Sequence, residues 1–140
     1  MPYRLDPQVA GELGEGTLLD SSTHPPIVSR VDYVLDLPQA DEFIQSFPVF
    51  LVSDGLGARL QAGGLTGFTL AEASVRPSEN YLALYGEAPH RQYLWMNVTG
   101  SPGQADTWLD ASFQVCVSDR MLAILEASEL SDCLVEEIDD

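Results

Sequence analysis

The residues of this chain that could do chemistry include two serines, two histidines and the aspartates Asp106 and Asp110, which flank Trp108. Ser53 and Ser118 each follow an apolar run and precede a helical pattern, a position that suits either a catalytic nucleophile or a helix N-cap. Both stand in the same tripeptide, Val-Ser-Asp, and this repetition favours two structural caps over two nucleophiles. His24 and His90 lie beside prolines, and neither neighbourhood contains an orienting carboxylate in a recognisable pattern.

The two cysteines do not form a metal-binding pattern. Cys116 and Cys133 are too far apart for a CxxC pair and have no histidine nearby, so we expect no metal site and no cofactor. Both fall where buried strands are expected, which predicts small apolar core residues, although a disulfide stays open outside a reducing compartment. No nucleophile elbow, P-loop or zinc-protease motif is present, and the sequence predicts no enzyme.

The charge of the chain is strongly unbalanced. Twenty-two acidic residues face six basic ones, all arginine, which gives a net charge of −16. Such a chain repels phosphate backbones, so direct binding to nucleic acid is not expected. The acidity has two interpretations: solvation alone, or a surface that attracts a basic protein partner. No apolar run is long enough to cross a membrane and no secretory signal is visible, which predicts a soluble cytoplasmic protein.

Aromatic and acidic residues in the last two thirds of the chain could form a partner-binding patch. The aromatic residues are predicted to be mostly core residues, but an exposed aromatic cluster ringed by acids would have the composition of an interaction hot spot. The acidic C-terminus is either a solvated tail or part of the same negative face. The candidate partner-binding residues are Tyr81, Tyr85, Trp95, Trp108, Asp106, Asp110, Glu136 and Glu137.

The hydrophobic pattern changes at about residue 30. Residues 1–30 are rich in Gly, Pro, Ser and acids without a clear period, which predicts an irregular or loosely attached arm. Residues 31–140 predict a single α+β domain, with a mixed β-sheet and short helices packed on it. Within it, "VFLVS" and "FQVCV" are typical of buried strands, whereas "QADEFIQSF" predicts a short helix or turn.

The chain contains two similar strand–helix–strand segments. "VSDGLGARLQAGGL" and "VSDRMLAILEASEL" align without gaps and are identical at seven of their fourteen positions. We interpret them as two structurally equivalent units, although any capped amphipathic helix that follows a strand would show part of this pattern. The identical positions in the first segment are Val52, Ser53, Asp54, Ala58, Leu60, Ala62 and Leu65.

These motifs carry a family resemblance. The order "FPVFLVSDGLGARLQAGGLTGF", "RQYLWMNVTGSPGQADTWL" and "FQVCVSDRMLAILEASELSDCLVEE" resembles an actinobacterial family of small acidic proteins. That family is similar to immunity proteins of bacterial polymorphic toxin systems. The likeness covers roughly residues 31–138. It implies a protein without enzymatic activity that binds and neutralises a toxin encoded nearby.

The sequence therefore leaves three functional classes open. The first is an acidic binding protein of the immunity type, whose partner would be a basic toxin. The second is a small accessory or scaffold module, with its own copies as one possible partner. The third is an enzyme of a kind that its motifs do not reveal, which would need a pocket holding perturbed ionisable groups.

Overall fold

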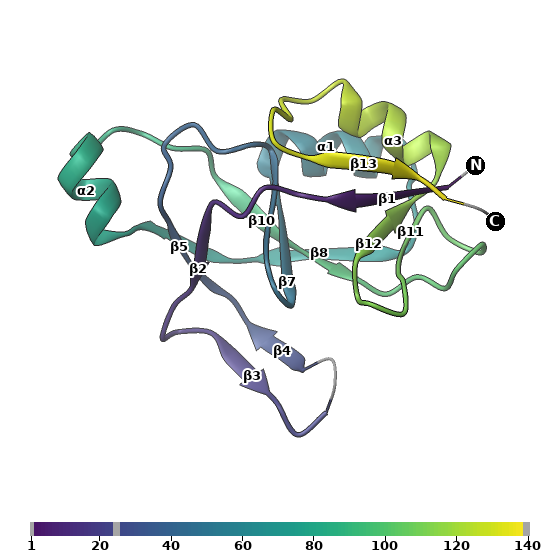
Figure 1. The fold of residues 1–140 in the computed structure, drawn as a ribbon, viewed down its shortest axis with the longest axis horizontal. Coiled ribbons are helices and arrows are strands. Elements are labelled where there is room, and N and C mark those ends of the chain that lie inside the picture. The colour runs from purple at the N-terminus through teal and green to yellow at the C-terminus, as the bar shows by residue number, and fades with distance from the viewer. Residues whose placement is uncertain (1, 24–25, 139–140) are drawn as a thin grey trace.

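The computed structural model describes residues 2–23 and 26–138, and over these residues the protein is α+β, as predicted (Figure 1). The described part of the chain has thirteen strands and three short helices. None of these three helices has the length and hydrophobicity needed to cross a membrane. His24 lies outside the described residues.

The strands form two four-stranded sheets, a three-stranded sheet and a two-stranded hairpin, rather than one central sheet. The first four-stranded sheet has the order β6-β7-β10-β8 and the second has the order β11-β12-β1-β13. The strands of these two sheets are β6 (Phe43–Ser46), β7 (Val49–Ser53), β10 (Tyr93–Val98), β8 (Phe68–Glu72), β11 (Thr107–Leu109), β12 (Val115–Val117), β1 (Tyr3–Asp6) and β13 (Leu134–Glu137). The remaining elements are β2 (Gly11–Leu13), β3 (Leu18–Asp20), β4 (Ile27–Arg30), β5 (Asp32–Leu35), β9 (Ser74–Pro77), α1 (Asp54–Ala62), α2 (Glu79–Tyr85) and α3 (Asp119–Glu126).

The two predicted units have the same topology. In the first unit, the hairpin β6–β7 leads into α1 and then into β8, and β10 lies antiparallel between β7 and β8. In the second unit, the hairpin β11–β12 leads into α3 and then into β13, and β1 lies antiparallel between β12 and β13. The helices α1 and α3 pack against each other, so the units meet through their helices (Figure 1).

The strand that lies between the helix-flanking strands, which we call the inserted strand, is β10 in the first unit and β1 in the second, and the two come from different parts of the chain. β10 follows β8 in sequence, whereas β1 is the first strand of the protein. The first and last described residues nevertheless lie side by side, and the Ile138 N–H donates to the Pro2 carbonyl at 2.9 Å (Figure 1). The second unit is therefore complete only when the N-terminal strand returns to it.

The prediction of an irregular N-terminal arm over residues 1–30 is wrong, because this range contains the four strands β1 to β4. β1 is an inner strand of its sheet and β2 pairs with β5, while β3 and β4 form a hairpin that projects from the body. Leu5 and Ala10 are 1% exposed and belong to the core. The pattern misses β1 because its four residues carry one buried apolar side chain, and its partners lie more than 100 residues away.

Two groups of apolar side chains fill the interior. One lies between the helices α1 and α3 and the two four-stranded sheets, and it includes Leu5, Leu56, Leu60, Met121 and Leu125. The other gathers residues of β5, β6, β7 and β10 around a second centre. The "QADEFIQSF" segment, predicted as a helix or turn, contributes to both as β6, because antiparallel pairing with β7 buries two of its apolar side chains.

The burial of Leu5 tests the attachment of the N-terminal strand. We expect Leu5→Ala to lower the free energy of unfolding by about 2–5 kcal/mol, because it removes apolar atoms from a filled core. Leu18→Ala, on the exposed β3, is the matched control and should change it by less than about 0.5 kcal/mol. Urea unfolding followed by circular dichroism measures both values. Equal effects of the two substitutions would contradict this placement of β1.

Candidate functional site

Ser53 and Ser118 are helix N-caps, as predicted. The Ser53 hydroxyl accepts the Leu56 N–H at 3.0 Å, and the Ser118 hydroxyl accepts the Met121 N–H at 3.2 Å. Each cap satisfies one of the backbone donors that a helix start leaves without an intrahelical acceptor. The remaining helix, α2, begins in the same way, because the Ser78 hydroxyl accepts the Tyr81 N–H.

The capping serines of α1 and α3 each donate a hydrogen bond to a carboxylate. The Ser53 hydroxyl donates to Glu42 Oε1 at 2.7 Å, and the Ser118 hydroxyl donates to Asp106 Oδ1 at 2.7 Å. In addition, the backbone N–H of each serine donates to the carbonyl of the same acidic residue. We call Glu42 and Asp106 the capping carboxylates. Both serine hydroxyls are thus engaged as donor and as acceptor within the fold.

The capping carboxylates also join the two units. Glu42, in the first unit, accepts the backbone N–H of Glu129, which follows α3 in the second unit, at 2.7 Å. Asp106, in the second unit, accepts the backbone N–H of Thr66, which follows α1 in the first unit, at 2.9 Å. The two links are reciprocal. Each carboxylate therefore fixes a helix start and the neighbouring unit at once.

An arginine completes each of these sites. Arg59 on α1 lies 3.1 Å from Glu42 Oε1, and Arg120 on α3 lies 3.0 Å from Asp106 Oδ2. Asp106 is one of the predicted partner-binding residues, whereas Glu42 is not among the residues that the sequence patterns point to. The signal that could have found Glu42 is an acid placed eleven residues before Ser53, as Asp106 stands twelve residues before Ser118.

The environment of the capping carboxylates lowers their pKa values. For Asp106, burial acts to raise the pKa, but hydrogen bonds from Arg120, Ser118 and Thr66 outweigh it and lower the pKa to about 2. The pKa of Glu42 is also lowered, by hydrogen bonds that likewise outweigh burial. Both groups are therefore carboxylates at neutral pH, and the folded state favours the charged form.

The aromatic candidates do not form one patch. Tyr81 is 1% exposed and Trp108 is 7% exposed, so the core interpretation holds for these two residues. The Tyr81 hydroxyl donates to the Ala88 carbonyl, and its ring meets the ring of Tyr85 edge-on at 5.7 Å. Tyr85 is 43% exposed at the surface of α2, whereas Trp95 is half-buried on β10. The four aromatic candidates are therefore divided among three elements, and the alternative of one exposed aromatic patch is wrong.

The acidic candidates also separate. Asp110 holds the β11–β12 turn, where it accepts the backbone N–H groups of Ser112 and Gln114. Arg4 bridges it to β13, with its Nε 2.7 Å from Asp110 Oδ2 and its Nη1 3.4 Å from Glu136 Oε2. Of the four acidic candidates, Asp106 and Asp110 thus serve the fold. Glu136 and Glu137 lie exposed on β13.

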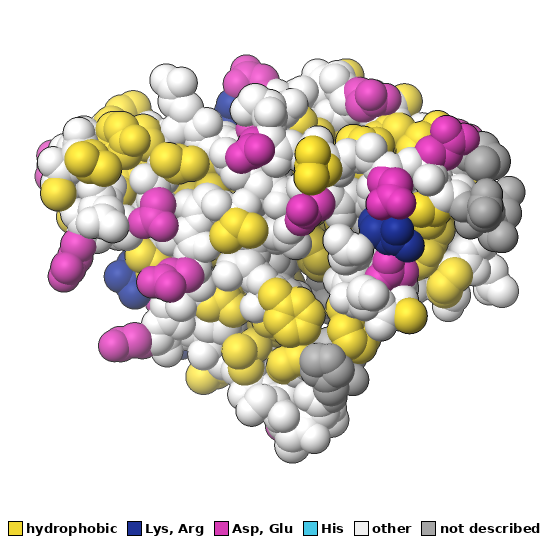
Figure 2. All heavy atoms as spheres, in the orientation of Figure 1, with side chains coloured by type: hydrophobic (Ala, Val, Ile, Leu, Met, Phe, Trp, Pro, Cys, Tyr) yellow, Lys and Arg dark blue, Asp and Glu magenta, His cyan; other side chains and the backbone are white. Residues whose placement is uncertain are grey.

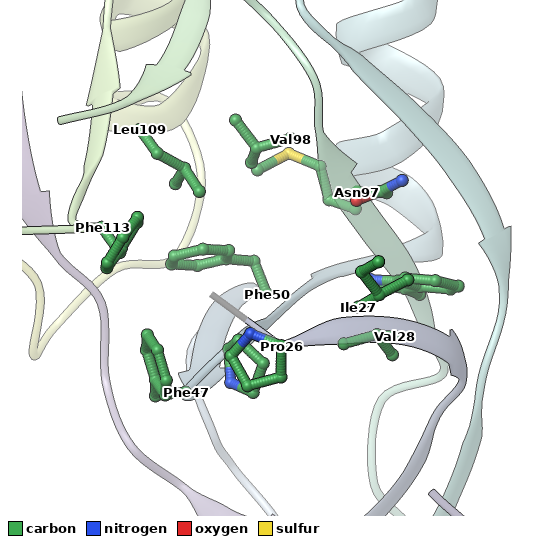
Figure 3. Close-up of a pocket in the computed structure, with 12 residues that line it drawn as sticks. Pro26, Ile27, Val28, Phe47, Phe50, Asn97, Val98, Leu109 and Phe113 are labelled. Carbon is green, nitrogen blue, oxygen red and sulfur yellow. The ribbon is translucent and has the colours of Figure 1, made fainter. Parts of the chain in front are cut away.

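A cleft lined mainly by apolar side chains lies where the β3–β4 hairpin meets the body (Figure 3). Its volume is about 230 Å³, and its lining includes Ile27 on β4, Phe47 before β7 and Trp95 on β10. The ring centroids of Phe47 and Phe113 lie 6.4 Å apart, and the two ring planes are tilted by 53°. Phe113 has a positive φ of 62°, a conformation that bulky residues rarely adopt. The turn bound to Asp110 holds this ring at the cleft.

The arginines contribute little free positive charge. Among the described residues, five of the six arginines form ion pairs with carboxylates. Acidic side chains remain spread over the surface, with groups around β13 and around β2 and α2 (Figure 2). The pairs within the described chain are Arg4–Asp110, Arg4–Glu136, Arg59–Glu42, Arg76–Asp32, Arg91–Glu129 and Arg120–Asp106.

Within the described residues, every buried side-chain nitrogen or oxygen atom has a hydrogen-bond partner. His90 bonds through Nδ1 to the Arg91 carbonyl, and its ring lies edge-on to Tyr81. Across residues 2–23 and 26–138, no three His, Cys, Asp or Glu side chains are grouped to hold a metal ion. Cys116 and Cys133 are free thiols, and burial raises both pKa values, that of Cys133 to about 11. Cys133 is half-buried and lies just before β13 rather than within a buried strand.

Comparison of this chain with family models, with curated proteins and with solved structures gives no match. The resemblance to the immunity family therefore stays a prediction.

The lowered pKa of Asp106 leads to a pH-dependent effect. Because the folded-state pKa of Asp106 is below the ordinary aspartate value of 3.8, its stabilising contribution is complete above that value and is lost as the pH falls to about 2. We expect Asp106→Ala to lower the free energy of unfolding by about 1–2 kcal/mol at pH 7, and by much less at pH 2. Urea unfolding at the two pH values measures this, with the exposed Glu12→Ala as control. A loss that is the same at both pH values would contradict it.

Proposed function

We propose that this protein is a non-enzymatic binding protein of the immunity type, which neutralises a basic toxin by direct contact. The observation that carries the proposal is that most of the arginines are engaged in ion pairs within the protein. Five of them are held in ion pairs among the described residues, so the charge that faces a partner is predominantly carboxylate. A surface of one sign attracts a partner of the other sign and speeds their encounter by roughly 10- to 1,000-fold.

The residues with catalytic potential support the same proposal. Ser53 and Ser118 are engaged in capping, and Asp106 is engaged with Ser118, Arg120 and a backbone N–H of the other unit. Groups that would have to move protons are thus held by the fold. The family resemblance independently favours toxin neutralisation. In this proposal the protein acts in the cytoplasm, where its two thiols stay reduced.

A second candidate function is an accessory or scaffold module that associates with its own copies. The cleft beneath the β3–β4 hairpin favours this alternative, because Ile27 is 58% exposed and Phe47 is 55% exposed. Exposed apolar side chains of this kind are often covered by a partner. In this case the acidity would serve solvation only.

Co-expression with the protein encoded by the adjacent gene tests the first candidate. We expect a stable complex with a basic protein and loss of that protein's toxicity in the host cell. Because charge steers the encounter, the association rate should fall at least about tenfold between about 50 mM and 500 mM NaCl. Stopped-flow fluorescence measures the rate. Recovery of this chain alone, or an association rate independent of salt, would count against the proposal.

Light scattering of the pure protein separates the two candidates. A monomer favours the toxin-binding protein, whereas a defined dimer favours the scaffold module. If a dimer forms through the cleft, Phe47→Ser should dissociate it. Leu84→Ser, on the exposed face of α2, is the matched control and should leave it intact.

A further inference from the structure

The outer side of β13 is an open strand edge. β13 pairs with β1 on one side, and no other described strand pairs with it. The hydrogen bond from the Ile138 N–H to the Pro2 carbonyl sets the alternation of this antiparallel ladder. Val135 and Glu137 therefore direct their backbone N–H and C=O groups away from β1. Such an edge can accept another extended strand.

A pocket adjoins this edge on the side of α3. Its volume is about 200 Å³, and it is lined by Leu122 and Leu125 of α3, Leu5 of β1 and Val135 of β13. Cys133 and Glu126 stand at its margin. Val135 is 45% exposed and points to this face, because it lies opposite the buried Leu5. The pocket thus lies beside the open backbone groups.

The equivalent place in the first unit is filled. The ungapped alignment of the units pairs Cys133 with the larger Phe68, and Leu122 with Gly57. Gly57 lets β8 and β10 close onto α1, since a Cβ there would lie 3.2 Å from methyl groups of Leu70 and Leu94. Two units of one topology therefore differ in whether this space between helix and edge strand is occupied.

The two edges also differ in charge. Around β13 stand four exposed carboxylates, those of Glu126, Asp132, Glu136 and Glu137. The aligned residues of the first unit carry one carboxylate, and they are Gln61, Gly67, Ala71 and Glu72. The nearby Arg4 is already shared between Asp110 and Glu136. The open edge of the second unit is therefore apolar at its centre and acidic around it.

We propose that the edge of β13 binds an extended basic segment of the partner protein as an added antiparallel strand. This inference rests on the proposed function and names the contact surface within it. An added residue opposite Val135 bonds to the backbone of β13 and points its side chain toward the pocket, which fits an apolar side chain. Residues opposite Glu136 and Glu137 lie against carboxylates, which fits lysine or arginine. Because the added strand is antiparallel, its sequence from N- to C-terminus is two basic residues, opposite Glu137 and Glu136, followed by two apolar residues, opposite Val135 and Leu134.

A basic segment suits this edge better than a second copy of the chain does. Pairing β13 with β13 of another copy would bring both sets of carboxylates together, and like charges at a strand pair are destabilising. A basic segment instead neutralises them and continues the sheet. The same charges disfavour pairing of the free protein with itself.

The first test uses the blocked peptide Thr-Lys-Lys-Leu-Val-Thr and the ¹⁵N-labelled full chain. We expect amide shifts at residues 134–137 and along α3, and smaller ones at residues 68–72 of β8. N-methylation of the peptide leucine removes an N–H that faces β13 and should weaken binding at least about tenfold. N-methylation of the peptide valine removes an N–H that faces solvent, and should change binding little. No binding, shifts centred on β2 or α2, or equal effects of the two methylations would each overturn the inference.

The second test uses matched substitutions at the two open edges. Glu137→Pro removes an outward N–H of β13 and keeps the ladder to β1, whereas Glu72→Pro makes the aligned change on β8. Thermal unfolding confirms that both variants fold. We expect Glu137→Pro to weaken binding of the adjacent-gene protein at least about tenfold, and Glu72→Pro to leave it unchanged.

The two proposals can fail separately. If the adjacent-gene protein binds both variants as it binds the unchanged chain, the β13 surface is wrong and the proposed function stands. If that protein does not bind at all while the peptide binds at β13 with the expected methylation pattern, the edge is a strand acceptor and the proposed partner is wrong.

Discussion

The structure depends on two carboxylates that each hold a helix start and a neighbouring unit together. Glu42 and Asp106 accept a hydrogen bond from the capping serine of their own unit and a backbone N–H from the other unit. Removing either carboxyl group would leave several donors without an acceptor in a partly buried place, which is costly. Arg59 and Arg120, which reach these carboxylates from the surface of α1 and α3, each neutralise one of them.

The equivalence of the two units makes their differences informative. Both share the hairpin, the capped helix and the inserted strand, so these features serve the fold. The differences are concentrated where helix and edge strand meet: Gly57 and Phe68 close the first unit, while Leu122 and Cys133 leave a pocket in the second. We propose that the closed first unit stabilises the fold and that the open second unit is the one that binds.

The distribution of charge and of apolar surface connects the fold with the proposed function. Carboxylates attract a basic partner over a distance of about a Debye length, roughly 8 Å at physiological salt, but they do not align it. Alignment requires directional contacts, and the backbone of an open strand edge provides them. The edge of β13 combines both properties, whereas the cleft beside Phe47 is lined mainly by apolar side chains.

The α+β class and both capped helices could be predicted from the sequence, because these signals are local. A serine after an apolar run, followed by Leu56 and Leu60 at helical spacing, is a pattern of a few residues. Only the tertiary structure decided the place of β1, the role of Glu42 and the open edge of β13. These depend on pairings between distant residues, such as Arg4 with Asp110, separated by 106 positions. Local periodicity carries no information about which distant strand completes a sheet, and hence none about which edge stays open.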